Sequence, residues 1–189
     1  SSSPYGIYLY YPYSNVQVLH NSIYMYGTGN PYAIYGYNST TSYKPVIKNN
    51  MFITAAGSSA YPIYYNGSYY NTSYFTVDYN NYYSSGSYIA YANSTSISSL
   101  SALQSTTGQD GYSVSINPAF MDVNIDLQLS DYTSFNCPKV ADVYIDIRNN
   151  IRSTTTNMGC YEPFMLDVAL YRSDSTPVSG VAYQTVPVS

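Results

Sequence analysis

Three residues in the first half of the chain, His20, Lys48 and Asp78, have side chains suited to acid–base chemistry. Each lies beside an asparagine of a repeated turn, so the three occupy equivalent positions in successive repeats and are expected to form one polar row. General acid–base catalysis needs a titratable group within reach of a substrate proton, and this row is the best such arrangement in the sequence. The same residue types are more often found at a solvated turn. We therefore expect no catalytic residues, with these three as the candidates should the chain be an enzyme.

Tyrosine is the second residue type with functional potential, because the chain has 28 tyrosines among 189 residues and no tryptophan. Tyrosines recur at matching positions of short alternating segments and are expected to form outward aromatic columns on one face. The predicted binding face comprises Tyr8, Tyr10, Tyr35, Tyr37, Tyr64, Tyr65 and Tyr91. Stacked tyrosines fix the register of neighbouring strands, whereas an exposed aromatic surface is typical of contacts with sugars or other proteins. Both interpretations remain open.

The segments that position these residues repeat about every 27–29 residues. One set of landmarks is Ile7, Ile34, Ile63 and Ile89, and a second is Asn21, Asn50 and Asn80. Each repeat has short alternating runs of Val, Ile, Tyr and Phe between Gly, Asn, Ser and Pro turns, which is typical of strands. Asparagine tolerates the left-handed conformation of a sharp bend, and its amide can bond the next repeat. The three asparagines are therefore predicted to form a structural ladder.

This repeat predicts an all-β fold, a right-handed parallel β-helix with about 27–29 residues per coil. Coils are expected over residues 1–98. Residues 99–163 are predicted to form the last coils and a C-terminal cap, with a short helix from about Ser99 to Thr106 that Gly108 terminates. Residues 164–189 are expected to begin a β-sandwich module or to form a linker.

Composition excludes two classes of partner. Six Lys and Arg against ten Asp and Glu give a net charge of −4, which leaves no cationic surface for a nucleic acid. No apolar run approaches the ~18 residues that a membrane-spanning helix needs. The chain opens on Ser1, Ser2 and Ser3 with neither an initiator Met nor a signal segment, so we expect it to be a piece of a longer polypeptide.

Several runs of residues carry a resemblance to a known family. Residues 100–110 (LSALQSTTGQD), 116–122 (INPAFMD) and 126–129 (DLQL) resemble, in the same order, the C-terminal coils of secreted bacterial β-helix proteins of the pectate-lyase-like superfamily. Residues 146–163 resemble the closing element of that group, except that Arg148 and Asn149 replace an aspartate and a glycine. Residues 167–186 resemble the first strands of an Ig-like module that often follows such helices.

The resemblance implies secretion through an oxidising compartment, which favours a disulfide between Cys137 and Cys160. Two separately buried thiols are the alternative. Superfamily members that cleave acidic polysaccharides use carboxylates to hold Ca²⁺ or to hydrolyse the glycosidic bond. No cofactor is expected here, with a Ca²⁺ site as the one alternative. The carboxylates considered for it are Asp122, Asp126, Asp131, Asp142 and Asp146.

The expected function is a non-enzymatic, extracellular structural or adhesive segment of a larger cell-surface or filament protein, with a tyrosine-rich contact face. Glycans, other surface proteins or further copies of the chain are the expected partners. The alternatives are the C-terminal part of a polysaccharide lyase or glycoside hydrolase with its active coils upstream, or a carbohydrate-binding β-helix. Residues 1–100 hold only Lys44, Lys48 and Asp78 as charged residues, and this scarcity favours the non-enzymatic function because polysaccharide cleavage needs clustered carboxylates.

Overall fold

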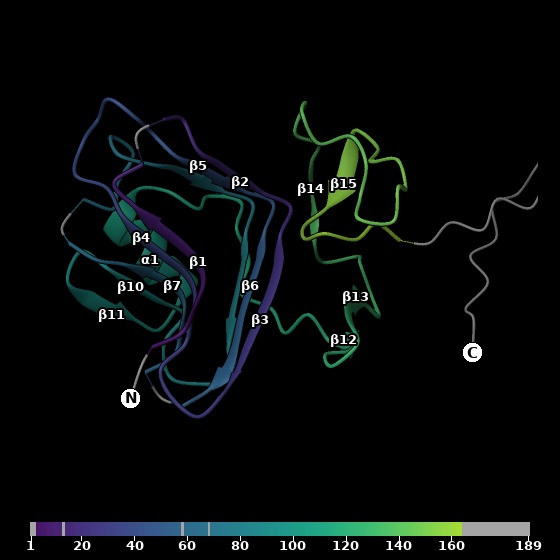
Figure 1. Cartoon of the computed structure of the whole chain (residues 1–189), viewed down its shortest axis with the longest axis horizontal. Helices are drawn as coiled ribbons and strands as arrows, with labels where there is room; N and C mark the ends of the chain where they lie inside the picture. The colour runs from purple at the N-terminus through teal and green to yellow at the C-terminus, as the bar shows by residue number, and fades with distance from the viewer. Residues whose placement is uncertain (1–2, 13, 58, 68, 164–189) are drawn as a thin grey trace, which may run out of the picture.

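A computed structural model describes residues 3–12, 14–57, 59–67 and 69–163 (Figure 1). These residues are mostly β-structure, with the helix α1 (Leu100–Thr107) after the first eleven strands. The first strands are β1 (Tyr5–Tyr10), β2 (Gln17–Leu19), β3 (Ser22–Gly27), β4 (Tyr32–Tyr37), β5 (Val46–Lys48), β6 (Met51–Ala56), β7 (Tyr61–Tyr65), β8 (Thr76–Asp78), β9 (Asn81–Ser84), β10 (Ala90–Ala92) and β11 (Thr95–Ile97). The later strands are β12 (Phe120–Asp122), β13 (Asp126–Leu129), β14 (Asn136–Pro138) and β15 (Thr155–Asn157). We call residues 3–97 the strand body and residues 117–163 the C-terminal lobe.

Strands one repeat apart lie side by side and parallel in the strand body. β1, β4, β7 and β10 form one sheet, β2, β5 and β8 a second, and β3, β6 and β9 a third. β11 pairs antiparallel with β10 and completes the first sheet. The three sheets place equivalent residues of successive repeats next to one another, which positions the tyrosines and asparagines considered below.

The register follows the repeat at most landmark residues. Ile7 lies opposite Ile34, and Ile34 lies opposite Ile63. In the last repeat, however, Ala90 rather than Ile89 lies opposite Ile63. The sequence alignment is wrong by one residue there because the chain turns into the β10–β11 hairpin, where Ile89 N–H donates to Ile97 O.

The core of the strand body is aliphatic and aromatic. Ile34, Ile47, Phe52 and Ile63 are fully buried there. Leu103 of α1 covers one end of this core and is also fully buried. Ser99 Oγ accepts a hydrogen bond from Ala102 N at the start of the helix, and Gly108, with φ 68°, terminates it. The helix predicted from the sequence is therefore confirmed to within one residue.

The C-terminal lobe has little regular structure. β12 pairs with β13 and β14 with β15, both antiparallel. Val114 and Ile145 form only isolated β-bridges, to Asn81 and Ile151. Figure 1 shows the lobe (green to yellow) beside β3 and β6. A second buried cluster joins the two parts there, and its members are Met51, Ile53, Leu129, Phe135, Cys137 and Met158.

The prediction of a right-handed parallel β-helix with a C-terminal cap is wrong. The strands form five separate sheets of two to five strands, and within the described residues these do not close into a solenoid. Residues 99–163 add no coil, since they contribute a helix and two antiparallel pairs. The physical reason is that the repeat spacing stops at β10, where a hairpin turns the chain back. The fold is mostly β, with small and mostly parallel sheets.

Two further predictions concern the ends of the fold. Residues 164–189, where a sandwich module or a linker was expected, lie outside the described residues. In the part of the chain that the structure describes, no helix has the length and apolar character needed to cross a membrane.

Candidate functional site: a tyrosine face

Four tyrosines of the first sheet form a continuous stack. Their ring centroids are 5.0 Å apart between Tyr8 and Tyr35, 5.6 Å between Tyr35 and Tyr64, and 4.5 Å between Tyr64 and Tyr91. The interplanar angles are 15°, 11° and 7°, so the rings are nearly parallel. This geometry follows from parallel, in-register strands, which place Tyr8 opposite Tyr35 and Tyr35 opposite Tyr64.

A second column of tyrosines lies beside this stack. The distances between ring centroids are 5.6 Å for Tyr5 and Tyr32, 5.9 Å for Tyr32 and Tyr61, and 5.9 Å for Tyr61 and Tyr88. Sequence reasoning missed these four residues because it followed only the alternating positions around each isoleucine. Their own spacing of 27, 29 and 27 residues was the signal that could have found them. We define the tyrosine face as Tyr5, Tyr8, Tyr10, Tyr32, Tyr35, Tyr37, Tyr61, Tyr64, Tyr88 and Tyr91.

Tyr65 does not belong to this face, contrary to the sequence prediction. It is 2% exposed and stacks on Tyr70 inside the core, with 4.0 Å between the centroids. Adjacent residues of a strand point to opposite sides, so Tyr64 and Tyr65 cannot share a face. Gly36 lies opposite Tyr65 and provides the space, because a Cβ at Gly36 would overlap the Tyr65 ring.

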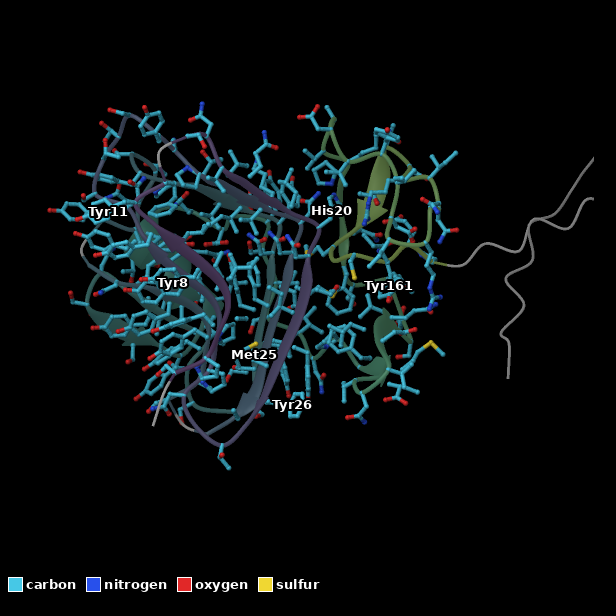
Figure 2. All side chains as sticks on the ribbon, viewed as in Figure 1. Tyr8, Tyr11, His20, Met25, Tyr26 and Tyr161 are labelled. Carbon is cyan, nitrogen blue, oxygen red and sulfur yellow. The ribbon has the colours of Figure 1, made fainter. Side chains whose placement is uncertain are left out.

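The first ring of the stack is the most exposed, and the second is buried. Tyr8 is 54% exposed and Tyr10 is 52% exposed, whereas Tyr35 is only 8% exposed. Figure 2 shows Tyr8 and Tyr11 on the side of the strand body away from the C-terminal lobe. Burial, together with repulsion from neighbouring phenols such as Tyr32, raises the pKa of Tyr64 to about 12. A phenol with this pKa is neutral at physiological pH, so it can both donate and accept hydrogen bonds.

The predicted acid–base row is not assembled as a catalytic group. Lys48 lies opposite Asp78 in the β5–β8 pair, but Leu19 rather than His20 is their partner in β2. Asp78 Oδ1 instead accepts the backbone N–H groups of Tyr79 and Tyr112. Lys48 and Asp78 line a cavity of about 350 Å³. His20 is one residue out of register and belongs to a different environment.

His20 is buried between the strand body and the C-terminal lobe (Figure 2). Its Nδ1 lies 3.2 Å from the carbonyl oxygen of Asn157, and its Nε2 lies 3.0 Å from Asn49 Nδ2. Burial, followed by the nearby positive charge of Arg152, lowers the pKa of His20 to about 4. Because both ring nitrogens have polar partners within the protein, His20 has a structural role and helps the C-terminal lobe pack against the strand body.

The three ladder asparagines are joined by side-chain hydrogen bonds. Asn21 Nδ2 donates to Asn50 Oδ1 at 2.9 Å, and Asn50 Nδ2 donates to Asn80 Oδ1 at 2.9 Å. The left-handed residues, however, precede the ladder asparagines, contrary to the sequence prediction. These residues are His20, Asn49 and Tyr79, with φ of 54°, 60° and 55°. The bend therefore lies one residue before each ladder asparagine, and the hydrogen bonds of the asparagine side chains stabilise it.

A buried carboxyl group that sequence reasoning missed lies three residues after the end of α1. Asp110 is 1% exposed, and its carboxylate oxygens accept the hydroxyl groups of Ser113, Tyr82 and Tyr70 at 2.7, 2.8 and 3.4 Å. Burial raises the pKa of Asp110 to about 7, although the hydroxyl donors act in the opposite direction. Asp110 ends the LSALQSTTGQD run, but nothing in that run indicated a buried position.

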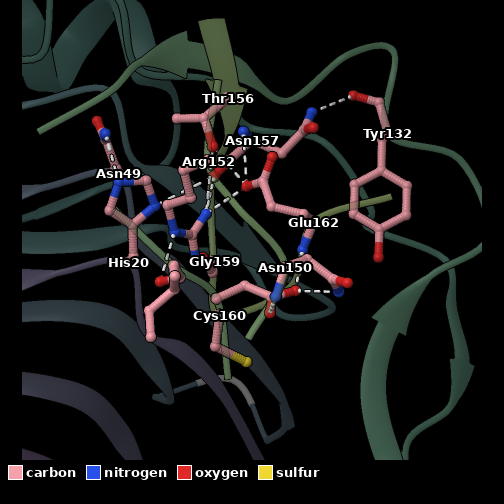
Figure 3. Close-up of polar contacts among 12 residues, drawn as sticks. His20, Asn49, Tyr132, Asn150, Arg152, Thr156, Asn157, Gly159, Cys160 and Glu162 are labelled. Carbon is pink, nitrogen blue, oxygen red and sulfur yellow. Dashed lines mark hydrogen bonds and ion pairs between the residues drawn. The ribbon is translucent and has the colours of Figure 1, made fainter. Parts of the chain in front are cut away.

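The C-terminal lobe holds a buried ion pair between Arg152 and Glu162 (Figure 3). Arg152 is 2% exposed, and it also donates to the carbonyl oxygen of Gly159 and to Thr156 Oγ1. The Glu162 backbone N–H in turn donates to the carboxylate of Asp146 at 2.9 Å. This network lies next to His20 and organises the segment that the family resemblance singled out.

The predicted disulfide is absent, because Cys137 and Cys160 are both free thiols. Cys137 is buried in β14 opposite Thr156. Cys160 is partly exposed, and its backbone N–H donates to Ser22 Oγ. Burial raises the pKa of Cys137 to about 12, so this thiol is unreactive at neutral pH.

The candidate Ca²⁺ carboxylates are not grouped. Among the residues that the structure describes, no cluster of three or more His, Cys, Asp or Glu side chains has the geometry to hold a metal ion. Asp122 and Asp131 each accept a backbone N–H two residues later. Asp126 pairs with Arg148, and Asp146 accepts three bonds within its own loop. Asp122, Asp131 and Asp146 therefore stabilise turns.

Comparisons with known proteins add no relative. No protein-family model matches the chain. No curated protein and no solved structure matches it either. The resemblance to the pectate-lyase-like superfamily therefore has no support beyond the residues that suggested it.

Proposed function

We propose that this chain is a non-catalytic adhesive module of a cell-surface or filament protein, which contacts its partner through the tyrosine face. The observation that carries the proposal is the unbroken stack Tyr8, Tyr35, Tyr64 and Tyr91 on the first sheet. A stack held by three strand pairings is rigid, so little side-chain entropy is lost when a partner binds. Tyrosine is also the residue type that gives large contact area with only two side-chain torsions.

The electrostatic character of the strand body supports the same function. Only Lys44, Lys48 and Asp78 are charged in residues 1–100. Contacts with this surface would therefore rest on ring packing and phenol hydrogen bonds, and they would depend little on salt. Protein surfaces rich in tyrosine are typical of binding hot spots.

The proposal is tested by weakening the exposed part of the tyrosine face. The double variant Tyr8→Ser/Tyr10→Ser removes two half-exposed rings and leaves the buried rings in place. The matched control is Tyr26→Ser/Tyr144→Ser, since these tyrosines are 69% and 62% exposed but lie outside the tyrosine face. Binding to cell-surface or filament material from the native source is measured for both. We expect the first variant to bind about tenfold more weakly, because a hot-spot residue contributes more than ~1 kcal/mol.

Equal binding by the two variants would contradict the proposal. Electron microscopy of the native material adds a second readout, since a cell-surface or filament protein is expected to appear in a regular assembly. Isolated particles there, together with equal binding, would leave the adhesive function without support.

A carbohydrate ligand is the second candidate, and one observation favours it. Tyr8 is the first ring of the stack, belongs to the edge strand β1 and is 54% exposed, although Tyr5 and Tyr10 also contact it. The exposed ring surface of Tyr8 and Tyr10 can pack against the apolar face of a sugar. Titration of neutral oligosaccharides with detection of the Tyr8 ring signals by NMR tests this, and unchanged signals would exclude it.

A further inference from the structure

The two ends of the strand body differ in how they are covered. β1, β2 and β3 are each the first strand of their sheet, so the whole first repeat forms an edge, which we call the open end. At the opposite end, Val114 bridges to Asn81, Gln109 Oε1 accepts the Val77 N–H, and α1 covers the core. We call this the covered end. Strand edges carry unpaired backbone groups, and proteins normally cover or blunt them.

The asparagine ladder has a direction that ends unsatisfied at the open end. Asn50 Oδ1 accepts both the backbone N–H and the Nδ2 group of Asn21, and Asn80 Oδ1 accepts the same two groups of Asn50. At the covered end, the Asn80 N–H donates to Ser113 Oγ. Asn21 Oδ1 receives no hydrogen bond from any described residue. The ladder thus presents one acceptor toward the place where a preceding asparagine would lie.

The apolar core is also incomplete at the open end. Ile7, Leu9, Val16, Ile23 and Met25 are only partly buried, although they pack against the core cluster. One repeat further on, Ile34 and Phe52, the partners of Ile7 and Ile23, are fully buried. Ile7 and Ile23 therefore lack the layer that buries their equivalents in the second repeat.

The tyrosine stack ends in the same way. Tyr8 is 54% exposed and its neighbour Tyr35 is 8% exposed. Tyr35 stacks on rings of two neighbouring strands, whereas Tyr8 lies in the edge strand and stacks across strands only on Tyr35. The backbone edge, the Asn21 acceptor, the aliphatic layer and the tyrosine stack therefore all end at the first repeat, where each could contact an equivalent group of a further repeat.

We propose that the open end binds a further repeat of this strand chemistry, with three extended strands parallel to β1, β2 and β3. Its aliphatic side chains would cover Ile7 and Ile23, a tyrosine would stack on Tyr8, and an asparagine would donate to Asn21 Oδ1. A second copy of this chain fits less well. Its own open end would bring two Asn21 acceptors together, and its covered end has helix α1 in place of three free edges. This inference does not rest on the proposed adhesive function.

The test adds such a repeat in place of residues 1–4. Residues 32–60 are copied and joined directly before Tyr5, because Tyr5 pairs with Tyr32 and Tyr32 pairs with Tyr61 in the native register. One control carries the same extension in scrambled order. A second control carries Asn50→Ala within the added copy, which removes the amide expected to reach Asn21 Oδ1.

Amide hydrogen exchange of β1, β2 and β3 is the readout. We expect the native extension to slow exchange at the outer amides of these strands by about tenfold or more, because an edge that opens freely becomes an interior layer. The Asn50→Ala extension should give a smaller gain, and the scrambled extension should give none. Equal exchange with the native and scrambled extensions would overturn the proposal.

A second arm works even if the extended chain does not fold. A synthetic peptide of residues 32–60 is added to the unmodified chain, and the same slowing of exchange in β1–β3 is expected. No slowing with the peptide would overturn the proposal when the extended chain is unfolded. Sedimentation of the unmodified chain alone tests the other occupant, since a dimer whose formation protects β1–β3 would also overturn the proposal.

Discussion

The strand body is stabilised by one kind of interaction and the C-terminal lobe by another. The strand body contains three charged residues in its 3–97 range and relies on stacked rings, aliphatic layers and amide bonds that recur in each repeat. The lobe contains nine charged residues, and both ion pairs of the described chain lie within it. Repetition spreads stability over many equivalent contacts, whereas the lobe depends on a few polar centres. Single substitutions should therefore have local, large effects in the lobe and graded effects in the body.

The largest effect is expected from Arg152→Ala. This change leaves Glu162 buried without its partner, and breaking a buried pair in this way typically costs about 3–5 kcal/mol. We expect hydrogen-exchange protection to be lost through residues 117–163, while β4, β6 and β7 keep theirs. The matched control is Arg148→Ala, because the Arg148–Asp126 pair is largely exposed.

The control should change stability by less than about 1 kcal/mol. If Arg152→Ala and Arg148→Ala cost the same, or if Arg152→Ala unfolds both parts together, the contrast between the lobe and the body is wrong. Denaturant unfolding measured alongside hydrogen exchange distinguishes these results.

The second prediction concerns pH, where the two regions should act in opposite directions. Asp110, which accepts hydrogen bonds from Tyr82 and Tyr70 of the strand body, has a folded pKa of about 7, above the unfolded value. Its contribution to stability is therefore present at about pH 4 and is lost as pH rises to 7. His20 at the lobe has a folded pKa of about 4, below its usual 6.5, so its contribution is present above pH 6.5 and is lost as pH falls to 4. Between pH 4.5 and 6.5 the stability lost at Asp110 as pH rises is nearly equal to the stability gained at His20.

Replacing one of the two groups should leave the pH dependence of stability that the other contributes. In Asp110→Asn, stability should rise with pH between 4.5 and 6.5, and in His20→Gln it should fall, each by up to about 1.4 kcal/mol per pH unit. Urea unfolding at pH 4.5, 5.5 and 6.5 measures the slopes. Parallel slopes for the two variants would show that these groups do not titrate as their surroundings indicate.

The same contrast explains what the sequence could predict. Period-two alternation and the repeat spacing were enough to pair Ile7 with Ile34 and to join Asn21 to Asn50, because local pattern decides both. Alternation also implies that Tyr64 and Tyr65 point to opposite sides of β7. What the pattern did not indicate is that Gly36 of the neighbouring repeat leaves the space for the inward Tyr65 ring.

The lobe was beyond prediction for a different reason. The burial of His20 depends on a carbonyl oxygen 137 residues away, and no periodicity links the two. The repeat likewise gave no indication that it would stop at β10, so the predicted solenoid was extended too far.

The third prediction compares positions within the asparagine ladder. In Asn50→Ala, the carbonyl oxygens of Val18 and Lys48 and the acceptor of Asn80 lose a buried donor, and the amide groups of Asn21 lose their acceptor. We expect a loss of about 3 kcal/mol, since each buried group left unsatisfied costs about 1–3 kcal/mol. Asn21→Ala at the open end should cost about 1 kcal/mol, because water can replace the lost bonds there. Equal losses of unfolding free energy in the two variants, measured by urea unfolding, would mean that water does not replace the hydrogen bonds lost at Asn21.

The smallest effect is expected from Gly36→Ala, which probes how closely successive repeats fit. The added methyl would overlap the Tyr65 ring, which Tyr70 holds in place from the other side, so overpacking of about 1–2 kcal/mol is expected. Gly57→Ala is the matched control, because only the carbonyl oxygen of Gly29 lies near its added Cβ, at 3.7 Å. The control should stay within about 0.5 kcal/mol of the original chain. Repeating Gly36→Ala in a Tyr65→Leu background should remove most of its cost, because the smaller side chain can yield. An unchanged cost in that background would show that the strain comes from the backbone of β4 and not from the ring that the glycine accommodates.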